Sequence, residues 1–299
     1  MHLLKLSDFT KDQILRLIQR AILLKGRRER GIPHAPLRGK TLALIFEKPS
    51  TRTRVSFEAA MTELGGNTIF ISSSDSQIGR GEPVKDTARV MSGYVDGVVI
   101  RTFGHGLIEE FAKYSKVPVI NGLTDTHHPC QVLADIMTIV EEKGSLDGIK
   151  AAWIGDGNNM ANSWIEAANI LGFSLVVACP DGYCPDRAVM DSIKGAKNIE
   201  VCKSVEEAVS NADVLNTDVW ASMGQEKERE NRVKAFKGYQ INAKILSLAK
   251  KDAMVLHCLP AHRDEEITDD VIEGRHSSVW QQAENRLHVQ KAILEMLLS

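Results

Sequence analysis

The stretch LRGKTLALIFEKPSTRTRVSFEAAMTELGGNTIFIS, Leu37–Ser72, contains the alternation that decides the fold. An apolar run at Thr41–Phe46 has the length of a buried strand, and a polar loop follows it. Phe57, Met61 and Leu64 then recur at helical spacing, and a Gly-Gly pair ends the helix before a second apolar run. The stretch therefore predicts a strand–helix–strand unit.

A second stretch, Leu146–Gly182, repeats this plan with a strand through Trp153 and Ile154, a Gly/Asn-rich loop, a helix ending at Leu171–Gly172, and another strand. Short apolar strands that alternate with helices form parallel sheets covered on both faces. We therefore expect an α/β protein of two doubly wound parallel-sheet domains, with the active site in the cleft between them. The GSLDG segment, residues 144–148, is the expected junction.

The bulk composition excludes several classes of protein. The chain has 299 residues, with 37 Lys+Arg against 39 Asp+Glu, so no global field attracts nucleic acid or an anionic membrane. Its N-terminus predicts an amphipathic helix, because apolar Ile14, Leu17 and Ile18 alternate with charges, unlike a signal peptide. No apolar run approaches the roughly 20 residues of a membrane span. We expect a cytoplasmic protein.

The cysteines give no sign of a structural framework. There are five, an odd number in a long chain, and none forms a C-x-x-C pair. Their default role is that of small buried side chains.

Residues Ser50–Arg54 place hydroxyl groups and two arginines at the start of a predicted helix, directly after a strand. Ser50 and Thr51 are suitable N-caps, and the N–H groups of a helix start attract anions. Guanidinium groups match phosphate oxygens in pairs, so the segment predicts a phosphate site. The alternative is a capped surface helix whose arginines pair with nearby acids, namely Glu47, Glu58 or Glu63.

Arg101 follows a predicted strand at Gly97–Ile100, and the segment His128–Gln131 follows a predicted strand at Val117–Ile120 and a short turn. An arginine, an imidazole and an amide at one sheet edge are suited to polarise a carbonyl oxygen beside a bound phosphate. A structural role is the alternative for each residue. The His127–His128 pair lacks the ligand spacing of a metal site.

The GDGNNM loop, residues 155–160, suggests a rival function. Its two glycines fit a dinucleotide-binding loop, but the third position is Met160. Asp181 stands near the place of a ribose-binding acid, so a nicotinamide-dependent dehydrogenase stays open. The amides of Asn158 and Asn159 suit an amino-acid head group instead.

Asp218 and Cys258 each follow a later predicted strand. The Asp218 carboxylate could hold an ammonium group or could serve only in a turn. Cys258 could be an ordinary buried cysteine. As a nucleophile it would need a base close by, and His257 points to the opposite face of an extended strand.

Six segments, in this order along the chain, resemble the ornithine carbamoyltransferases of the aspartate/ornithine carbamoyltransferase family: FEKPSTRTR, HPCQ, GDGNN, DVWASMGQE, HCLPAHR and QAENRLH. The likeness covers essentially the whole chain. Aspartate carbamoyltransferases resemble the first half but carry HPLPR in place of HCLPAHR and lack the SMG segment. The resemblance implies carbamoyl transfer from carbamoyl phosphate to the side-chain amine of L-ornithine, giving L-citrulline and phosphate, without a metal or cofactor. It places the reaction in arginine metabolism, and both arginine biosynthesis and citrulline breakdown stay open as its direction.

The resemblance also implies a set of carbamoyl phosphate ligands: Ser50, Thr51, Arg52, Thr53, Gln77, Arg101, His128, Gln131, Cys258, Leu259 and Arg286. Gln77 matches a residue that reaches the substrate of a neighbouring subunit, which implies a homotrimer, or a multiple of trimers, with shared sites. Arg286 implies that the C-terminal helix, 281–299, joins the first domain. We thus expect a carbamoyl phosphate-binding domain of residues 1–143 with 281–299, and an ornithine-binding domain of residues 144–280.

The implied ornithine ligands are Asn159, Asp218, Ser222 and Met223. The amine of ornithine resembles that of lysine, with a pKa of about 10.4, so it must lose a proton before it attacks. Among the implied catalytic residues, Asp218 orients the amine and Cys258 accepts or relays its proton, while Arg101 and His128 stabilise the oxyanion. A non-catalytic phosphometabolite-binding protein stays open beside the dehydrogenase, as do putrescine, lysine and acetylated ornithine as acceptors.

Overall fold

The computed structural model describes residues 1–72, 81–221 and 228–299. The chain divides into two compact units: unit 1 comprises Met1–Met137 with Asn285–Ser299, and unit 2 comprises Thr138–Glu284. Both divisions fall inside helices and not at the GSLDG segment. The domain limits expected from the sequence stay a prediction.

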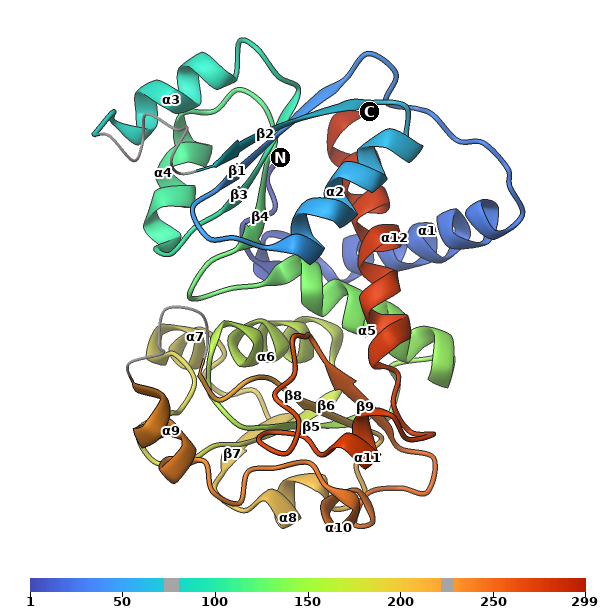
Figure 1. Ribbon diagram of the computed structural model, residues 1–299, viewed down its shortest axis with the longest axis vertical. Helices are drawn as coiled ribbons and strands as arrows, with labels where there is room; N and C mark the ends of the chain where they lie inside the picture. The colour runs from blue at the N-terminus through green and yellow to red at the C-terminus, as the bar shows by residue number, and fades with distance from the viewer. Residues whose placement is uncertain (73–80, 222–227) are drawn as a thin grey trace. The chain divides into compact units, whose positions relative to one another are not determined.

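Unit 1 is built around a four-stranded parallel sheet with strand order β2-β1-β3-β4. In Figure 1, α3 and α4 cover one face of this sheet, and α1, α2 and α12 lie on the other side. The elements are η1 (Leu6–Asp8), α1 (Lys11–Glu29), β1 (Thr41–Phe46), α2 (Thr51–Glu63), β2 (Asn67–Ser72), α3 (Val84–Met91), β3 (Gly97–Arg101), α4 (His105–Tyr114), β4 (Val119–Leu123), α5 (Pro129–Lys143) and α12 (Val279–Leu298). Helices α5 and α12 each extend from one unit into the other.

Unit 2 contains a five-stranded parallel sheet with strand order β7-β6-β5-β8-β9. Helices α8, α10 and α11 cover one face, and α6 and α7 cover the other (Figure 1). The elements are β5 (Lys150–Ile154), α6 (Asn159–Leu171), β6 (Ser174–Ala178), α7 (Arg187–Ser192), β7 (Ile199–Cys202), α8 (Val205–Val209), β8 (Val214–Thr217), α9 (Arg229–Ala235), α10 (Ala243–Leu246), β9 (Met254–His257) and α11 (Asp269–Ile272). The predicted fold class, two doubly wound parallel-sheet units, is confirmed.

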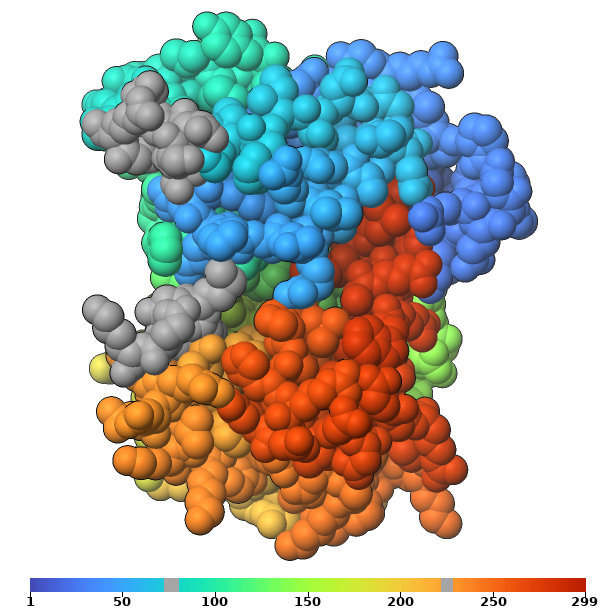
Figure 2. All heavy atoms as spheres, viewed as in Figure 1, coloured from blue at the N-terminus to red at the C-terminus, as the bar shows by residue number. Residues whose placement is uncertain are grey.

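Helices α2 and α6 end at the glycines that the sequence predicted as their ends. Gly172 caps α6 with φ of 89°, a left-handed conformation that glycine adopts without a steric penalty. Gly65, with φ of 84°, follows α2 in the same manner. The fully buried Phe57 and Met61 lie on the inner face of α2, whereas its outer face lies at the surface of unit 1 (Figure 2).

Each sheet has one point at which the chain reverses its direction of winding. In unit 1 this switch point lies between β1 and β3, and in unit 2 it lies between β5 and β8. Doubly wound sheets bind their ligands outside the carboxyl ends of the strands at such points. The loops that follow these four strands are therefore the places to look for function.

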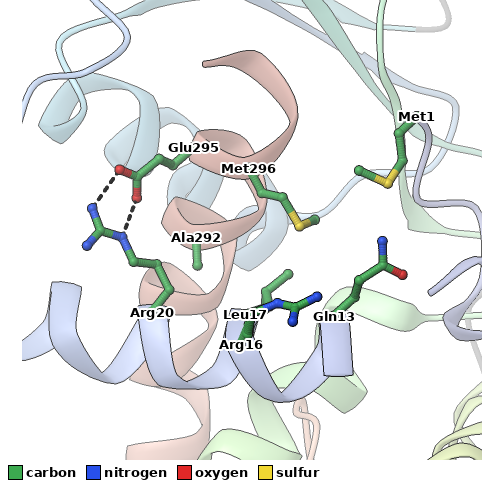
Figure 3. Close-up of a pocket in the computed structure, with 8 residues that line it drawn as sticks. All are labelled: Met1, Gln13, Arg16, Leu17, Arg20, Ala292, Glu295 and Met296. Atoms are coloured by element: carbon green, nitrogen blue, oxygen red, sulfur yellow. Dashed lines mark hydrogen bonds and ion pairs between the residues drawn. The ribbon is translucent and has the colours of Figure 1, made fainter. Parts of the chain in front are cut away.

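The C-terminal helix α12 is anchored to unit 1 by ion pairs. Glu295 accepts from the Arg20 guanidinium of α1 at 2.6 and 2.7 Å, and Lys291 donates to Glu63 of α2 at 2.7 Å. A pocket of about 420 Å³ lies beside the Arg20–Glu295 pair (Figure 3) and is lined by Met1, Gln13, Arg16, Leu17, Arg20, Ala292, Glu295 and Met296. Neither α12 nor any other helix of the described residues is long and apolar enough to cross a bilayer.

Candidate active site

The first group of polar residues lies at the switch point of unit 1. Ser50 is the N-cap of α2, and its hydroxyl accepts a hydrogen bond from the Thr53 N–H at 3.4 Å. Thr53 is fully buried, and its Oγ1 accepts from the Arg286 guanidinium of α12 at 2.7 Å. This contact joins residues 233 positions apart in the sequence, and it brings Arg286 to the loop after β1.

The two arginines of this segment have different surroundings. Arg54 pairs with Glu58 at 2.9 Å and lies over the Phe70 ring at 3.7 Å, so the surface-helix interpretation is correct for this residue. Arg52 is exposed, and no hydrogen bond or ion pair engages its side chain within the described parts of the chain. Of the pair, Arg52 is the one available to an anion. Thr51 is also exposed, at the first position of α2.

His128 is buried close to three cations. Burial, followed by the charges of Arg286, Arg101 and Arg52, holds the pKa of His128 well below its usual 6.5, so the imidazole is neutral at pH 7. Arg101 is itself 7% exposed at the end of β3. A neutral, polar ring among guanidinium groups suits an anionic ligand, because it adds a hydrogen-bonding group without adding charge.

Gln131 completes this group on the first turn of α5. Its Nε2 donates to Asp135 Oδ1 at 2.9 Å, which fixes the orientation of the amide. Its Oε1 is buried, and no donor among the described residues reaches it. A buried acceptor of this kind is suited to a ligand N–H group. Cys130 beside it is inert, since burial raises the pKa of its thiol to about 12.

The second group of polar residues lies at the switch point of unit 2, around Asp218. Asp218 Oδ2 accepts from the Asn158 amide at 2.8 Å, and its Oδ1 accepts from the Val219 N–H at 2.8 Å. The Cys258 thiol donates to the same Oδ1 at 3.0 Å. The partner that Cys258 needs is therefore a carboxylate that the sequence places 40 positions away, not the adjacent histidine.

Asn158 also belongs to this group; its amide was predicted to suit an amino-acid head group, although the ligands implied by the resemblance do not include it. Its Oδ1 caps α6 by accepting from the N–H groups of Met160 and Ala161, while its Nδ2 holds Asp218. An N-cap asparagine after the strand at a switch point was the available signal. Asn159, which was predicted, is half-buried at the first position of α6.

His257 supports the segment that follows it. Its Nε2 lies 3.0 Å from Glu266 Oε1 in the core, and its Nδ1 accepts from the Leu259 N–H at 2.9 Å. Both ring nitrogens are thus engaged. Leu259 has φ of 58°, a conformation that side-chain-bearing residues adopt at a cost and that this hydrogen bond helps to hold.

The metal-binding potential of the second group is low. Ligand atoms of Asp218, His257 and Cys258 lie within 4.8 Å of one another. Since the His257 nitrogens are occupied by Leu259 and Glu266, only a carboxylate and a thiol stay open. Two ligands do not make the three- or four-ligand site that zinc requires.

The family of the chain follows from two matches that together cover almost its whole length. The carbamoyl-P binding domain of aspartate/ornithine carbamoyltransferase matches residues 1–141, and the Asp/Orn binding domain matches residues 147–297. The chain belongs to the aspartate/ornithine carbamoyltransferase family.

Individual carbamoyltransferases are similar over their full length. Ornithine carbamoyltransferase of Geobacter metallireducens is 60% identical over 299 residues, which cover 99% of each chain, and that of Geobacter sulfurreducens is 59% identical with the same coverage. The ornithine carbamoyltransferase structure from Pyrococcus furiosus aligns with a TM-score of 0.96 at 50% identity, covering 99% of this chain and 96% of that one. The anabolic enzyme of Campylobacter jejuni aligns with a TM-score of 0.93 at 46% identity, covering 99% and 98%.

The predicted carbamoyltransferase residues fall into three sets. In unit 1 the structure gathers Arg52, Arg101, His128 and Arg286, with Ser50, Thr53 and Gln131 on the adjoining helix starts. In unit 2 it gathers Asp218 and Cys258. Asn159 is the first residue of α6, directly after Asn158, and Leu259 directly follows Cys258. Gln77, Ser222 and Met223 lie outside the described residues.

Proposed function

We propose that the protein transfers the carbamoyl group of carbamoyl phosphate to the side-chain amine of L-ornithine, giving L-citrulline and phosphate. One observation carries the proposal. Each unit places a chemically distinct group of residues at its own switch point, cationic in the unit that matches the carbamoyl-P binding domain, and acidic in the unit that matches the Asp/Orn binding domain.

The cationic group supplies what carbamoyl phosphate needs. Arg52 and the N–H groups at the start of α2, with the hydroxyls of Ser50, Thr51 and Thr53, bind the phosphate. Arg101 and neutral His128 stabilise the negative charge that develops on the carbonyl oxygen during attack. The open Oε1 of Gln131 accepts from the carbamoyl NH2 group. Arg286 holds Thr53 in place and adds charge.

The acidic group is suited to an amine and unsuited to a second carboxylate. Asp218 accepts a hydrogen bond from the ammonium group of ornithine and orients it. The amine loses its proton to Asp218, with the Cys258 thiol as relay through the Oδ1 that it already touches. The freed nitrogen then forms the N–C bond as the C–O bond to phosphate breaks, and its second proton leaves with the phosphate. An aspartate substrate would bring its carboxylate towards Asp218, so the geometry favours ornithine.

The finer assignments rest on likeness to the family. We assign carbamoyl phosphate binding to residues 1–143 with 281–299 and ornithine binding to residues 144–280. The junction lies between the two family matches, which end at residue 141 and begin at residue 147. The second match runs to residue 297, and we assign the C-terminal helix to the first domain because Arg286 contacts Thr53. Gln77 from a neighbouring subunit completes each site in a homotrimer. We place the enzyme in the cytoplasm. We assign it to arginine biosynthesis because the similar Campylobacter jejuni enzyme is named as anabolic.

The decisive test is an acceptor panel on one preparation. Initial rates of carbamoyl transfer are measured with ornithine, aspartate, putrescine, lysine and acetylornithine at saturating carbamoyl phosphate, with an Asp218→Asn variant as the folded control. Ornithine should give by far the highest kcat/KM, and Asp218→Asn should lose about 100-fold or more of it. Absence of citrulline from a folded sample, or a faster rate with another acceptor, would reject the assignment. Binding of NADH, measured by fluorescence, would instead support the function of a nicotinamide-dependent dehydrogenase.

A further inference from the structure

Two cysteines outside the site face each other in unit 2. The Sγ atoms of Cys179 and Cys184 lie 3.7 Å apart, at the two ends of the turn that follows β6. The turn is tight, because Gly182 has φ of 83° and the Tyr183 N–H donates to the Pro180 carbonyl at 3.1 Å. A disulfide requires an S–S distance of about 2.05 Å, so the sulfurs need to approach by about 1.7 Å.

The two thiols differ in a way that orders their chemistry. Cys184 is exposed and accessible to a small oxidant, whereas Cys179 is buried. Burial, followed by the neighbouring Cys184 sulfur, raises the pKa of Cys179 to about 12, so this thiol is protonated at pH 7 and Cys184 is the thiol that meets the oxidant first. Cys202 is the competing partner, since its carbonyl accepts from the Cys179 N–H at 3.2 Å. Its own thiol donates to the Ser204 carbonyl at 3.4 Å.

We propose that Cys179 and Cys184 form a redox-modification site that reacts with hydroperoxides and closes into an intramolecular disulfide. The Cys184 sulfur attacks one oxygen of the hydroperoxide, the O–O bond breaks, and sulfenic acid and an alcohol form. The Cys179 sulfur then attacks the Cys184 sulfur, the S–O bond breaks, and hydroxide leaves with the Cys179 proton as water. Two thiols lose two electrons in total, and one hydroperoxide accepts them.

The turn that carries these thiols supports the loop before α6. The Gly157 N–H donates to the Tyr183 carbonyl at 2.8 Å, and a side chain at Gly157 would lie 2.3 Å from the backbone of Cys184. The two backbones are therefore in direct contact. Asn158, the next residue, holds Asp218. A shift of Cys184 towards Cys179 would therefore displace Gly157 and, through it, the Asn158 side chain that holds the Asp218 carboxylate.

A second contact runs from the same turn to Asp156. The Tyr183 ring packs against Phe236 with centroids 4.8 Å apart, and it lies 4.9 Å from the Arg232 guanidinium. Arg232 forms a buried ion pair with Asp156 at 2.7 Å. Resting on the proposed function, we infer that closing the disulfide raises the KM for ornithine and that reduction reverses the change.

The first test maps the bond without using activity. The full-length protein is treated with hydrogen peroxide, alkylated with iodoacetamide in denaturant, and digested with trypsin, which leaves both cysteines in one peptide because no Lys or Arg lies between them. We expect this peptide to be unalkylated and lighter by two hydrogen atoms. The change should disappear in Cys184→Ser and persist in the matched control Cys202→Ser. Sulfinic acid on Cys184 beside an alkylated Cys179, or a Cys179–Cys202 link, would overturn the proposal.

The second test measures ornithine KM before oxidation, after it, and after dithiothreitol, in wild type and Cys184→Ser treated in parallel. Damage to Cys258 affects both proteins equally, so only their difference reports the pair. On oxidation the KM of the wild type for ornithine should rise by about threefold or more, and dithiothreitol should reverse the rise. The KM of the variant should not change. A mapped disulfide with equal KM in both would refute the coupling to Asp218. A protein that forms the disulfide on oxidation but makes no citrulline before oxidation would instead reject the proposed function.

Discussion

At the scale of the residue, the function of a charged group depends on whether its neighbours already use its charge. Arg52 and Arg54 are two positions apart on α2, yet Arg54 is engaged by Glu58 and Phe70 while Arg52 projects from the helix start. Similarly, the Cys130 and Cys258 thiols differ because one is buried with a backbone carbonyl and the other contacts a carboxylate. Residue type alone does not distinguish these roles.

The arginine pair supplies a matched comparison. Arg52→Ala should lower kcat/KM for carbamoyl phosphate by about 100-fold or more, because it removes a guanidinium from the departing phosphate, and the fold should be unchanged. Arg54→Ala should change it by less than about threefold, since an exposed ion pair contributes little. Steady-state kinetics and circular dichroism check both. Similar losses in the two variants would contradict the assignment of the loop.

His128 should leave a signature in the pH dependence of stability. Its pKa is lowered on folding, so between the folded value and 6.5 the unfolded state binds a proton that the folded state does not. The stabilisation is thus fully present above pH 6.5 and is lost as pH falls below it. His128→Gln should weaken this loss, as measured by urea unfolding at about pH 5.5 and 7.5. An equal pH dependence in both proteins would show that folding does not lower the pKa of His128.

At the scale of the element, both groups of residues use the same construction, a helix that starts directly after a strand at a switch point. Ser50 caps α2 and Asn158 caps α6, and each cap is adjacent to a residue assigned to substrate. The loop before α6 is tighter, because Gly157 packs against the backbone of the Cys184 turn. The position of the cap therefore depends on a glycine.

Gly157→Ala should damage this construction. The added Cβ would lie 2.2 Å from the Pro185 nitrogen and 2.3 Å from the Cys184 carbonyl carbon, so the backbone must shift. We expect a loss of about 1–3 kcal/mol in unfolding free energy, typical of overpacking, together with a higher KM for ornithine. Gly106→Ala is the control, since nothing lies within 4 Å of its added Cβ. Urea unfolding and kinetics on both variants decide, and equal stability would show that the loop can relax.

At the scale of the whole molecule, the chain uses one architectural plan twice and gives each copy a different chemistry. The sheets β2-β1-β3-β4 and β7-β6-β5-β8-β9 each reverse once, and the two reversals carry the cationic and the acidic groups respectively.

The proposed sharing of active sites between subunits predicts complementation between inactive variants. If Gln77 of one subunit serves the Arg52 site of the next, a mixed trimer of Gln77→Ala and Arg52→Ala subunits contains a site with both native residues. The two proteins are refolded separately and together, and citrulline formation is compared. The mixture should exceed the sum of its parents. Strict additivity would place the complete site within one subunit.

The strand of unit 1 that was predicted at Val117–Ile120 shows where local reading fails. The structure has β4 at Val119–Leu123, which includes the Asn-Gly pair that normally indicates a turn. Gly122 fits there because a Cβ would lie 3.1 Å from the Val99 side chain, and Asn121 donates its amide to the Leu4 carbonyl. Both neighbours are distant in the sequence, so no local pattern could report them.

The sequence by itself determined the alternation of strands and helices, the helix ends at Gly65 and Gly172, and the chemical types of the site residues, because these depend on neighbours within a few positions. Only the tertiary structure decided which of these residues meet. The contacts of the Cys258 thiol with Asp218 and of the Arg286 guanidinium with Thr53 are set by how strands and helices pack. Packing brings these side chains together in space, and their separation along the chain does not predict which of them meet.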